Sequence, residues 1–289
     1  MHRLFGRWPF RVCLYPVVFA LWCMHSRVRR ASMEYLQHME QSTGALGHAP
    51  RARDSLQHLL LFAETLLDKL LAVSGRYRFE HVQTEGRESL YEAAQQRLGG
   101  VIVVAHMGCL ELCRAMAEHS QALKLNVLVH TKHATEFNRV LQKLNPANSI
   151  NLIEVETINL ATSLVLSEKV ARGEYVVIAG DRIPVTASQT VDVEFLGRQA
   201  PFPVGPYVLS SLLKCPLYFL GCIHAGRGYI VHFELLTEQV VLPRGQRQAH
   251  MAQYAALYAR ALTALLVRSP YDWFNFFPFW DQSHDIRLP

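Results

Sequence analysis

The sequence predicts an α/β fold with a mixed, mostly parallel sheet flanked by helices. Between residues 100 and 181, short apolar segments alternate with segments of helical periodicity, which is typical of parallel strands joined by helices. Beyond residue 181, two apolar segments flank a glycine-containing turn, which predicts an antiparallel hairpin. The chain has 289 residues, 50% of them hydrophobic, so it is long enough to bury one large core.

The first 33 residues differ from the rest of the chain. Six arginines precede the first acidic residue, Glu34, and they lie on both sides of the apolar stretch 12–24. This stretch is shorter than the roughly 20 residues that a membrane-spanning helix needs. Arginines on both sides favour a helix that lies in an anionic membrane surface, although a signal peptide and a buried basic helix are alternatives. We therefore expect an N-terminal membrane-associated helix within 1–33 and a single domain over 34–289.

The elements of that domain follow from periodicity. A polar loop over 41–53 precedes a helix whose leucines recur at three and four residues between 56 and 71. Apolar runs predict strands, and apolar residues at helical spacing predict the helices between them. The strands are expected at 101–105, 125–130, 150–154 and 175–179, and the helices at 108–119, 133–144 and 158–171. A Pro/Gly-rich segment (197–206) then leads to a short helix, the hairpin and a helix over about 246–267.

A histidine follows the first strand of the predicted sheet, in VIVVAHMGCLE (101–111). Ligands bind at the carboxyl ends of strands in open α/β sheets, so His106 is a candidate site residue. Glu111 lies about 500° of helix rotation further on, so His106 must precede the helix, with Gly108 in the turn. We expect Glu111 to accept a hydrogen bond from Nδ1–H of His106, leaving Nε2 free to take a proton from a hydroxyl. A structural histidine at a strand end is the alternative.

A second predicted strand is followed by two charged residues at the same edge of the sheet. The segment EYVVIAGDR (174–182) ends in Asp181 and Arg182, which could form a plain salt bridge. However, two strands that deliver His106, Glu111, Asp181 and Arg182 to one edge indicate a functional site better than either strand does alone.

Composition and motifs exclude several function classes. The net charge of +5 is small and no basic stripe is interleaved with aromatic residues, so we expect no nucleic-acid partner. The sequence contains no GxSxG elbow, no P-loop and no GxGxxG. Cys109 and Cys113 could bind a metal together with His106, but no CxxC pair exists and buried core cysteines are more common. We expect no metal and no resident cofactor.

Four segments carry a resemblance to a known family. AHMGCLE, TKHATEFNRVL, GDRIPVTASQTVDVEFLGRQAPFPVGPYVLSSLLKCPLYF and YDWFNFFPFW together resemble the bacterial late acyltransferases of lipid A biosynthesis, in the glycerophosphate and lysophospholipid acyltransferase-like superfamily. The resemblance covers nearly the whole chain and is greatest to the relatives found in aryl polyene pigment clusters. It implies a glycerolipid acyltransferase-like fold over 34–289.

The resemblance also implies a reaction. His106 would deprotonate an acceptor hydroxyl, which attacks the thioester of an acyl carrier protein, while Glu111 orients and charge-stabilises the histidine. Asp181, Arg182 and Arg139 would bind substrate, although Arg139 could equally be a solvated helix residue. The partners implied are acyl carrier protein, a membrane lipid acceptor such as lipid A or another glycolipid, and the cytoplasmic face of a bacterial inner membrane. A lysophospholipid acyltransferase that uses coenzyme A and a catalytically silent membrane-bound scaffold are the alternatives.

Two further features bear on the substrates. Many lipid A enzymes have HxGNWE at the motif, whereas Cys109 and Leu110 stand there in this chain, so the acceptor need not be lipid A itself. The segment 271–280 holds seven aromatic residues. These would either form a membrane interface and the walls of an acyl groove, or close the core.

Overall fold

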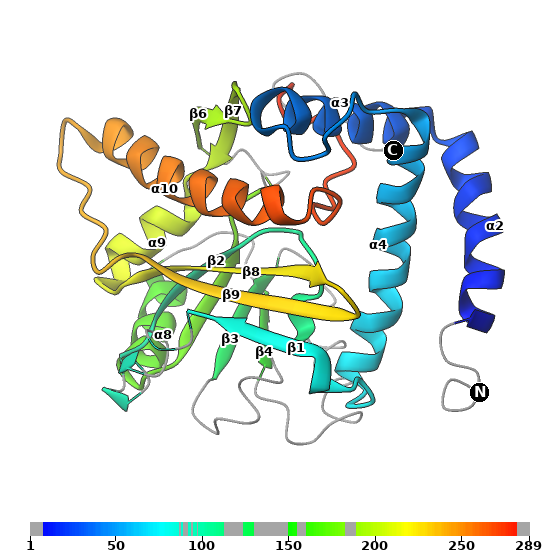
Figure 1. Cartoon of the computed structure of the whole chain (residues 1–289). Coiled ribbons are helices and arrows are strands. Elements are labelled where there is room, and N and C mark those ends of the chain that lie inside the picture. Colours follow the sequence, from blue (N-terminus) through cyan, green and yellow to red (C-terminus); the bar gives the residue numbers. More distant parts are fainter. Residues whose placement is uncertain are drawn as a thin grey trace.

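The computed structural model of the chain (Figure 1) describes residues 8–86, 98–112, 124–129, 150–154, 160–182 and 189–281, together with 88, 92–93 and 95–96. The helices are α2 (Trp8–Met24), α3 (Ser26–Thr43), α4 (Ala52–Val73), α8 (Leu160–Ala171), α9 (Gly205–Leu213) and α10 (Arg247–Arg268), with 3-10 turns η1 (Phe79–His81) and η2 (Leu110–Leu112). The strands are β1 (Val82–Glu85), β2 (Gly100–Val104), β3 (Leu125–Val129), β4 (Ile150–Glu154), β5 (Tyr175–Ala179), β6 (Thr190–Phe195), β7 (Arg198–Pro203), β8 (Leu217–Ala225) and β9 (Gly228–Thr237).

Seven strands form one mixed sheet in the order β1-β9-β8-β2-β5-β3-β4. Strands β8, β2, β5, β3 and β4 are parallel neighbours, and β9 joins β8 as the antiparallel hairpin that the sequence predicts. All four predicted strands of the parallel part are present to within a residue or two. The mixed, mostly parallel sheet is therefore confirmed.

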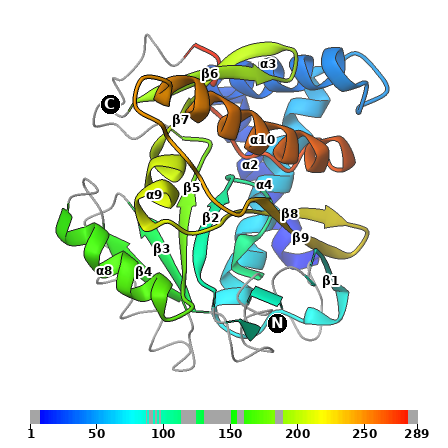
Figure 2. The ribbon, with the colours of Figure 1, turned by 90° about the vertical axis from the view of Figure 1, so that its left-hand side faces the viewer.

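Helices cover both faces of the sheet, as predicted. On one face, α3, α8, α9 and α10 pack against Val101 and Val103 of β2 in a large apolar cluster (Figures 1 and 2). On the other face, a second cluster joins Ile102 and Val104 to the end of α4. This alternation along β2 is the strand periodicity of two, and it makes the strand a fully buried apolar run. The predicted helix over 133–144 and most of the one over 108–119 lie outside the described residues.

The boundary expected at residue 33, between an N-terminal segment and the domain, falls inside a helix. Helix α3 runs from Ser26 to Thr43 across this expected boundary, and its residues Tyr35, Leu36 and Met39 are buried in the main core. Helix α2 packs on the side of α4 that faces away from the sheet (Figure 1). Among the described helices, none is both long and apolar enough to cross a membrane.

A small second sheet, which the sequence did not predict, is formed by one strand before the Pro/Gly-rich segment 197–206 and one strand within it. Strands β6 and β7 pair antiparallel around a turn at Gly197, whose φ is +77°. The buried residues of β6 alternate (Val191, Val193 and Phe195), so one face of this hairpin closes the core beneath α10. The prolines of β7 are compatible with a strand here because a two-stranded sheet leaves each strand with a free edge.

Candidate active site

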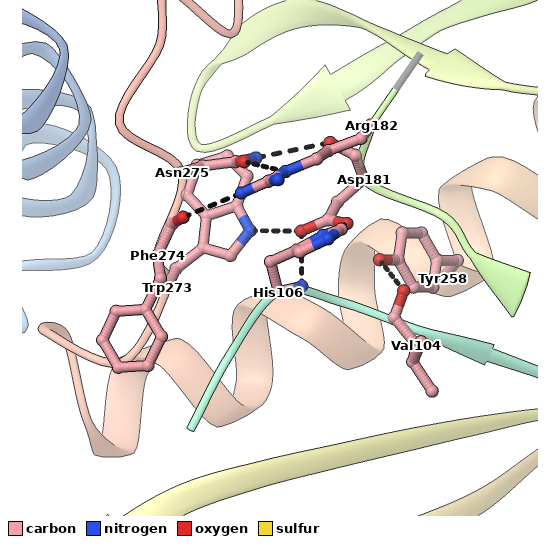
Figure 3. A network of polar contacts seen from close by, with 8 residues as sticks. All are labelled: Val104, His106, Asp181, Arg182, Tyr258, Trp273, Phe274 and Asn275. Carbon is pink, nitrogen blue, oxygen red and sulfur yellow. Dashed lines mark hydrogen bonds and ion pairs between the residues drawn. The ribbon is translucent and has the colours of Figure 1, made fainter. Parts of the chain in front are cut away.

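His106 lies in the turn that follows β2, with its side chain 37% exposed (Figure 3). The carbonyl oxygen of Val104, just before this turn, accepts hydrogen bonds from Gly180 N–H (2.8 Å) and from the Tyr258 hydroxyl (3.1 Å). The backbone carbonyl of His106 itself accepts a bond from Phe274 N–H (2.7 Å). The backbone around the histidine is therefore held by three different parts of the chain.

The imidazole of His106 is paired with Asp181. Strands β2 and β5 are neighbours in register, with Val104 opposite Ala179, so the residues two positions further on lie side by side. Asp181 Oδ1 accepts from Nδ1 of His106 (2.7 Å), and Oδ2 accepts from the backbone N–H of His106 (2.7 Å). Because the carboxylate can only accept, the proton lies on Nδ1 and Nε2 carries the free lone pair.

Asp181 is completely buried, and a tryptophan fixes its position. The indole Nε1–H of Trp273 donates to Oδ2 of Asp181 (2.9 Å). Burial raises the pKa of Asp181, but the charge of His106 and the hydrogen bonds from His106 and Trp273 outweigh burial and lower its pKa overall. The carboxylate is thus stabilised in the ionised form that supports a base at His106.

The segment 271–275 supplies the other contacts of this network (Figure 3). Asn275 Nδ2 donates to the carbonyl of Asp181 (3.3 Å), and its Oδ1 accepts from Nε of Arg182 (3.3 Å). Three of the seven aromatic residues over 271–280 (Trp273, Phe279 and Trp280) are buried in the main core and two more, Tyr271 and Phe277, pack against it, so the segment closes the core, which was one of the two alternatives for it.

Glu111 does not have the contact that the sequence predicts. The hydrogen bond expected between Glu111 and Nδ1 of His106 is wrong, because Asp181 occupies that nitrogen. Glu111 lies in η2, where one carboxylate oxygen is 3.5 Å from Nζ of Lys69 and the other is 3.7 Å from Sγ of Cys109. The physical reason is register: β5 brings a short carboxylate directly beside the histidine, whereas the 3-10 turn directs the longer side chain towards α4.

The predicted substrate-binding residues have different surroundings. Asp181 is fully buried and bonded to His106 and Trp273, so its contacts are those of a residue that positions His106, and its expected role in substrate binding stays a prediction. Arg182 is exposed, and it bonds to Asn275 and to the carbonyl of Phe274 (3.3 Å) rather than to Asp181. Arg139 lies outside the described residues.

The turn after His106 requires glycine, as the sequence predicts. Gly108 has φ +46°, in the left-handed region, and a Cβ there would lie 2.1 Å from the carbonyl oxygen of Cys222.

Cys109 is fully buried in the second apolar cluster, where burial raises the pKa of its thiol. Over the described residues, no three His, Cys, Asp or Glu side chains come together as a metal site would need. What the geometry offers directly is a base, since Nε2 of His106 can exchange a proton with a bound hydroxyl.

Sequence reasoning missed the residues that support the pair. Trp273 and Asn275 were considered only as part of an aromatic tail, although two polar residues, Asp272 and Asn275, interrupt its rings. Such buried polar residues in an apolar run were the available signal, since a buried polar group needs a partner.

Comparison with known families identifies the family of the chain. The family model described as bacterial lipid A biosynthesis acyltransferase matches residues 72–282, which include His106, Asp181 and the 271–275 segment. A search of the curated proteins found no match. Since the matched region covers more than half of the 289 residues, the chain belongs to the bacterial lipid A biosynthesis acyltransferase family.

Proposed function

We propose that this protein transfers a fatty acyl chain from the thioester of acyl carrier protein to a hydroxyl of a membrane glycolipid or other lipid acceptor. The observation that carries the proposal is the pair of a partly exposed His106 and a buried Asp181 at the carboxyl edge of the sheet, in a member of an acyltransferase family. The base, its orienting carboxylate and the exposed Nε2 side of the ring are the parts that acyl transfer to a hydroxyl requires.

The reaction follows from the state of the imidazole. Nε2 of His106 takes the proton of the acceptor hydroxyl as the oxygen attacks the thioester carbonyl, and Asp181 stabilises the imidazolium that forms. When the tetrahedral intermediate collapses, the C–S bond breaks and Nε2–H returns the proton to the departing sulfur. A thiol with a pKa of about 8.5 is a good leaving group, so no acyl-enzyme is needed.

The role of Glu111 follows from its contact with Lys69. Both side chains are 31% exposed, and α4 brings Lys69 to the strand ends beside η2. A carboxylate at this position suits a hydrogen bond to the acceptor better than one to His106. Next to Glu111 stand Cys109 and Leu110, in place of the asparagine and tryptophan common in lipid A enzymes. This difference supports the proposal that the acceptor is not lipid A but another glycolipid, such as that of an aryl polyene-type pathway.

The protein acts at a membrane surface under this proposal, on the cytoplasmic face of the bacterial inner membrane. Helix α2 carries large apolar side chains that remain exposed although its other side packs on α4. These are Trp8, Val12, Tyr15, Val17, Phe19, Leu21 and Met24. Apolar side chains exposed on both flanks of the contact with α4 favour insertion into the boundary between head groups and acyl chains.

The membrane proposal is tested by vesicle sedimentation. The double variant Val17→Glu and Phe19→Glu is expected to lose binding to anionic phospholipid vesicles, whereas Leu164→Glu, at an exposed apolar position on α8, is expected to bind as wild type does. Equal sedimentation of all three proteins would reject the proposal that the exposed apolar residues of α2 bind the membrane.

The function is tested by transfer of radiolabelled acyl chains from acyl carrier protein into a total lipid extract. Wild type is expected to label one lipid species, and His106→Ala is expected to label none. Parallel reactions with acyl-coenzyme A identify the donor, because the carrier-dependent reaction should have the higher kcat/KM. Transfer by His106→Ala at the wild-type rate, or no transfer by wild type from either donor, would reject the proposal.

A further inference from the structure

A second histidine–carboxylate pair lies at the same edge of the sheet. Nδ1 of His224, at the end of β8, is 2.5 Å from Oδ1 of Asp272, and the backbone N–H of His224 donates to Oδ2 (2.6 Å). These are the same two contacts that join His106 to Asp181. Asp272 is 0% exposed, as Asp181 is, and the His224 side chain is 21% exposed.

The two histidines lie at the carboxyl ends of neighbouring strands. Strands β2 and β8 are parallel neighbours, with Val104 opposite Leu220. His106 follows the last residue of β2 by two positions, and His224 is the last residue but one of β8.

One short segment supports both pairs. The carbonyl of Asp272 accepts from Gly108 N–H (3.1 Å) in the turn after His106, while its carboxylate holds His224. The next residue, Trp273, donates to Asp181. The second pair is therefore built into the support of the first, which fixes the position of one imidazole relative to the other.

The free nitrogen of His224 is an acceptor. Because the Asp272 carboxylate can only accept, the proton lies on Nδ1 and the neutral ring presents a lone pair at Nε2. Among the residues that the structure describes, none bonds to this Nε2. The other side of the ring is fixed, since it lies 4.3 Å from the ring of Tyr229, whose hydroxyl donates to the buried Asp68 (2.8 Å).

We propose that Nε2 of His224 binds a second hydroxyl of the acceptor while the first hydroxyl reacts at His106. The inference rests on the proposed function and deepens it, because it makes the acceptor a molecule with several hydroxyls. The surroundings favour a hydroxyl over a phosphate. Among the described residues, the carboxylates of Asp68, Glu111 and Asp272 lie on this side, and Lys69 is already paired with Glu111. A phosphate would be repelled, whereas a hydroxyl can donate to Nε2.

The experiment measures steady-state transfer from radiolabelled acyl carrier protein while the concentration of the total lipid extract is varied. His224→Phe keeps a flat ring without the acceptor nitrogen, and His224→Gln keeps a side-chain acceptor. His81→Phe, at an exposed histidine on η1, is the matched control. Each variant is also checked by thermal unfolding, so that a folding defect is recognised.

We expect the variant to change the KM for the lipid extract but neither the KM for acyl carrier protein nor kcat. His224→Phe should raise the apparent KM for the lipid extract about tenfold, which corresponds to one hydrogen bond, with the KM for acyl carrier protein unchanged and kcat within about twofold. His224→Gln should recover part of this loss. An unchanged KM for the extract in His224→Phe, or a fall in kcat with no change in KM, would overturn the inference while leaving the acyltransferase proposal intact.

A phosphatase-treated extract separates hydroxyl from phosphate. If treatment raises the wild-type KM and removes the difference between wild type and His224→Phe, the bound group is a phosphate and the hydroxyl assignment is wrong. If the difference persists, the hydroxyl assignment stands. Absence of transfer by wild type would reject the proposed function itself, and the inference with it.

Discussion

Replacing Asp181 with asparagine should disable the base without changing its position. Oδ2 of Asp181 accepts two hydrogen bonds, from the backbone N–H of His106 (2.7 Å) and from Nε1–H of Trp273 (2.9 Å). These two donors would orient the new amide so that its oxygen takes the Oδ2 position. The amide NH₂ would then face Nδ1 of His106, which must become an acceptor. The proton would move to Nε2, where the base is needed.

The size of the effect follows from two losses. The ring would be held in the wrong tautomer, and the imidazolium would lose its buried counter-charge. In serine proteases the equivalent aspartate-to-asparagine change lowers kcat by about 10⁴. A loss of about 10³ to 10⁴ in kcat, or about 4 to 5 kcal/mol of transition-state stabilisation, is therefore expected for Asp181→Asn. The KM values for both substrates should change little, because Asp181 is fully buried.

The assay is single-turnover and steady-state acyl transfer, with Asp192→Asn, an exposed position on β6, as the matched control. Glu111→Gln is measured beside them. Because Glu111 contacts Lys69 rather than His106, its kcat should fall less than that of Asp181→Asn. An Asp181→Asn enzyme that keeps more than a tenth of the wild-type kcat would refute this account of the site.

Three other changes test the support of the site. Trp273→Phe removes a buried hydrogen bond to the Asp181 carboxylate and should lower the free energy of unfolding by about 2 kcal/mol in urea titrations. Burial lowers the pKa of His58 from 6.5 to about 4, so the unfolded chain binds the proton first. Stability should therefore fall between pH 6.5 and 4 by about 3 kcal/mol, and His58→Gln should lack this part of the slope. Gly108→Ala places a Cβ 2.1 Å from the Cys222 carbonyl, so it should lower both the melting temperature and the transfer rate.

The parallel part of the sheet could be predicted because each strand is a short run of apolar residues between polar or glycine-containing segments. Strands β2 and β5 are buried on both faces or nearly so, and their sequences, GVIVV and YVVIA, contain little else. Their carboxyl ends deliver His106 and Asp181 to one edge, which is why the edge itself was predicted correctly.

The partner of His106 could not be predicted, because it depends on register between strands that are about 75 residues apart in sequence. Sequence spacing favoured Glu111, which is near in the chain, over Asp181, which is near in space. The contact between segment 271–275 and the site could not be predicted for a related reason. Its apolar composition indicates burial, but only the antiparallel bridge between Met107 and Trp273 reveals that it lies against the turn after His106.

Helices α3 and α4 also hold the site, through that same segment. Nε2–H of the fully buried His58 in α4 donates to the carbonyl of Trp273 (2.8 Å), and Nδ1 accepts from the hydroxyl of Ser32 in α3 (3.0 Å). The Tyr35 hydroxyl of α3 donates to the carbonyl of Pro270 (2.6 Å). Residues 26–71 precede the region that matches the family, yet they fix the backbone from which Trp273 reaches Asp181. The geometry of the base therefore depends on the N-terminal helices, and α2, which packs on α4, links that geometry to the surface proposed to meet the membrane.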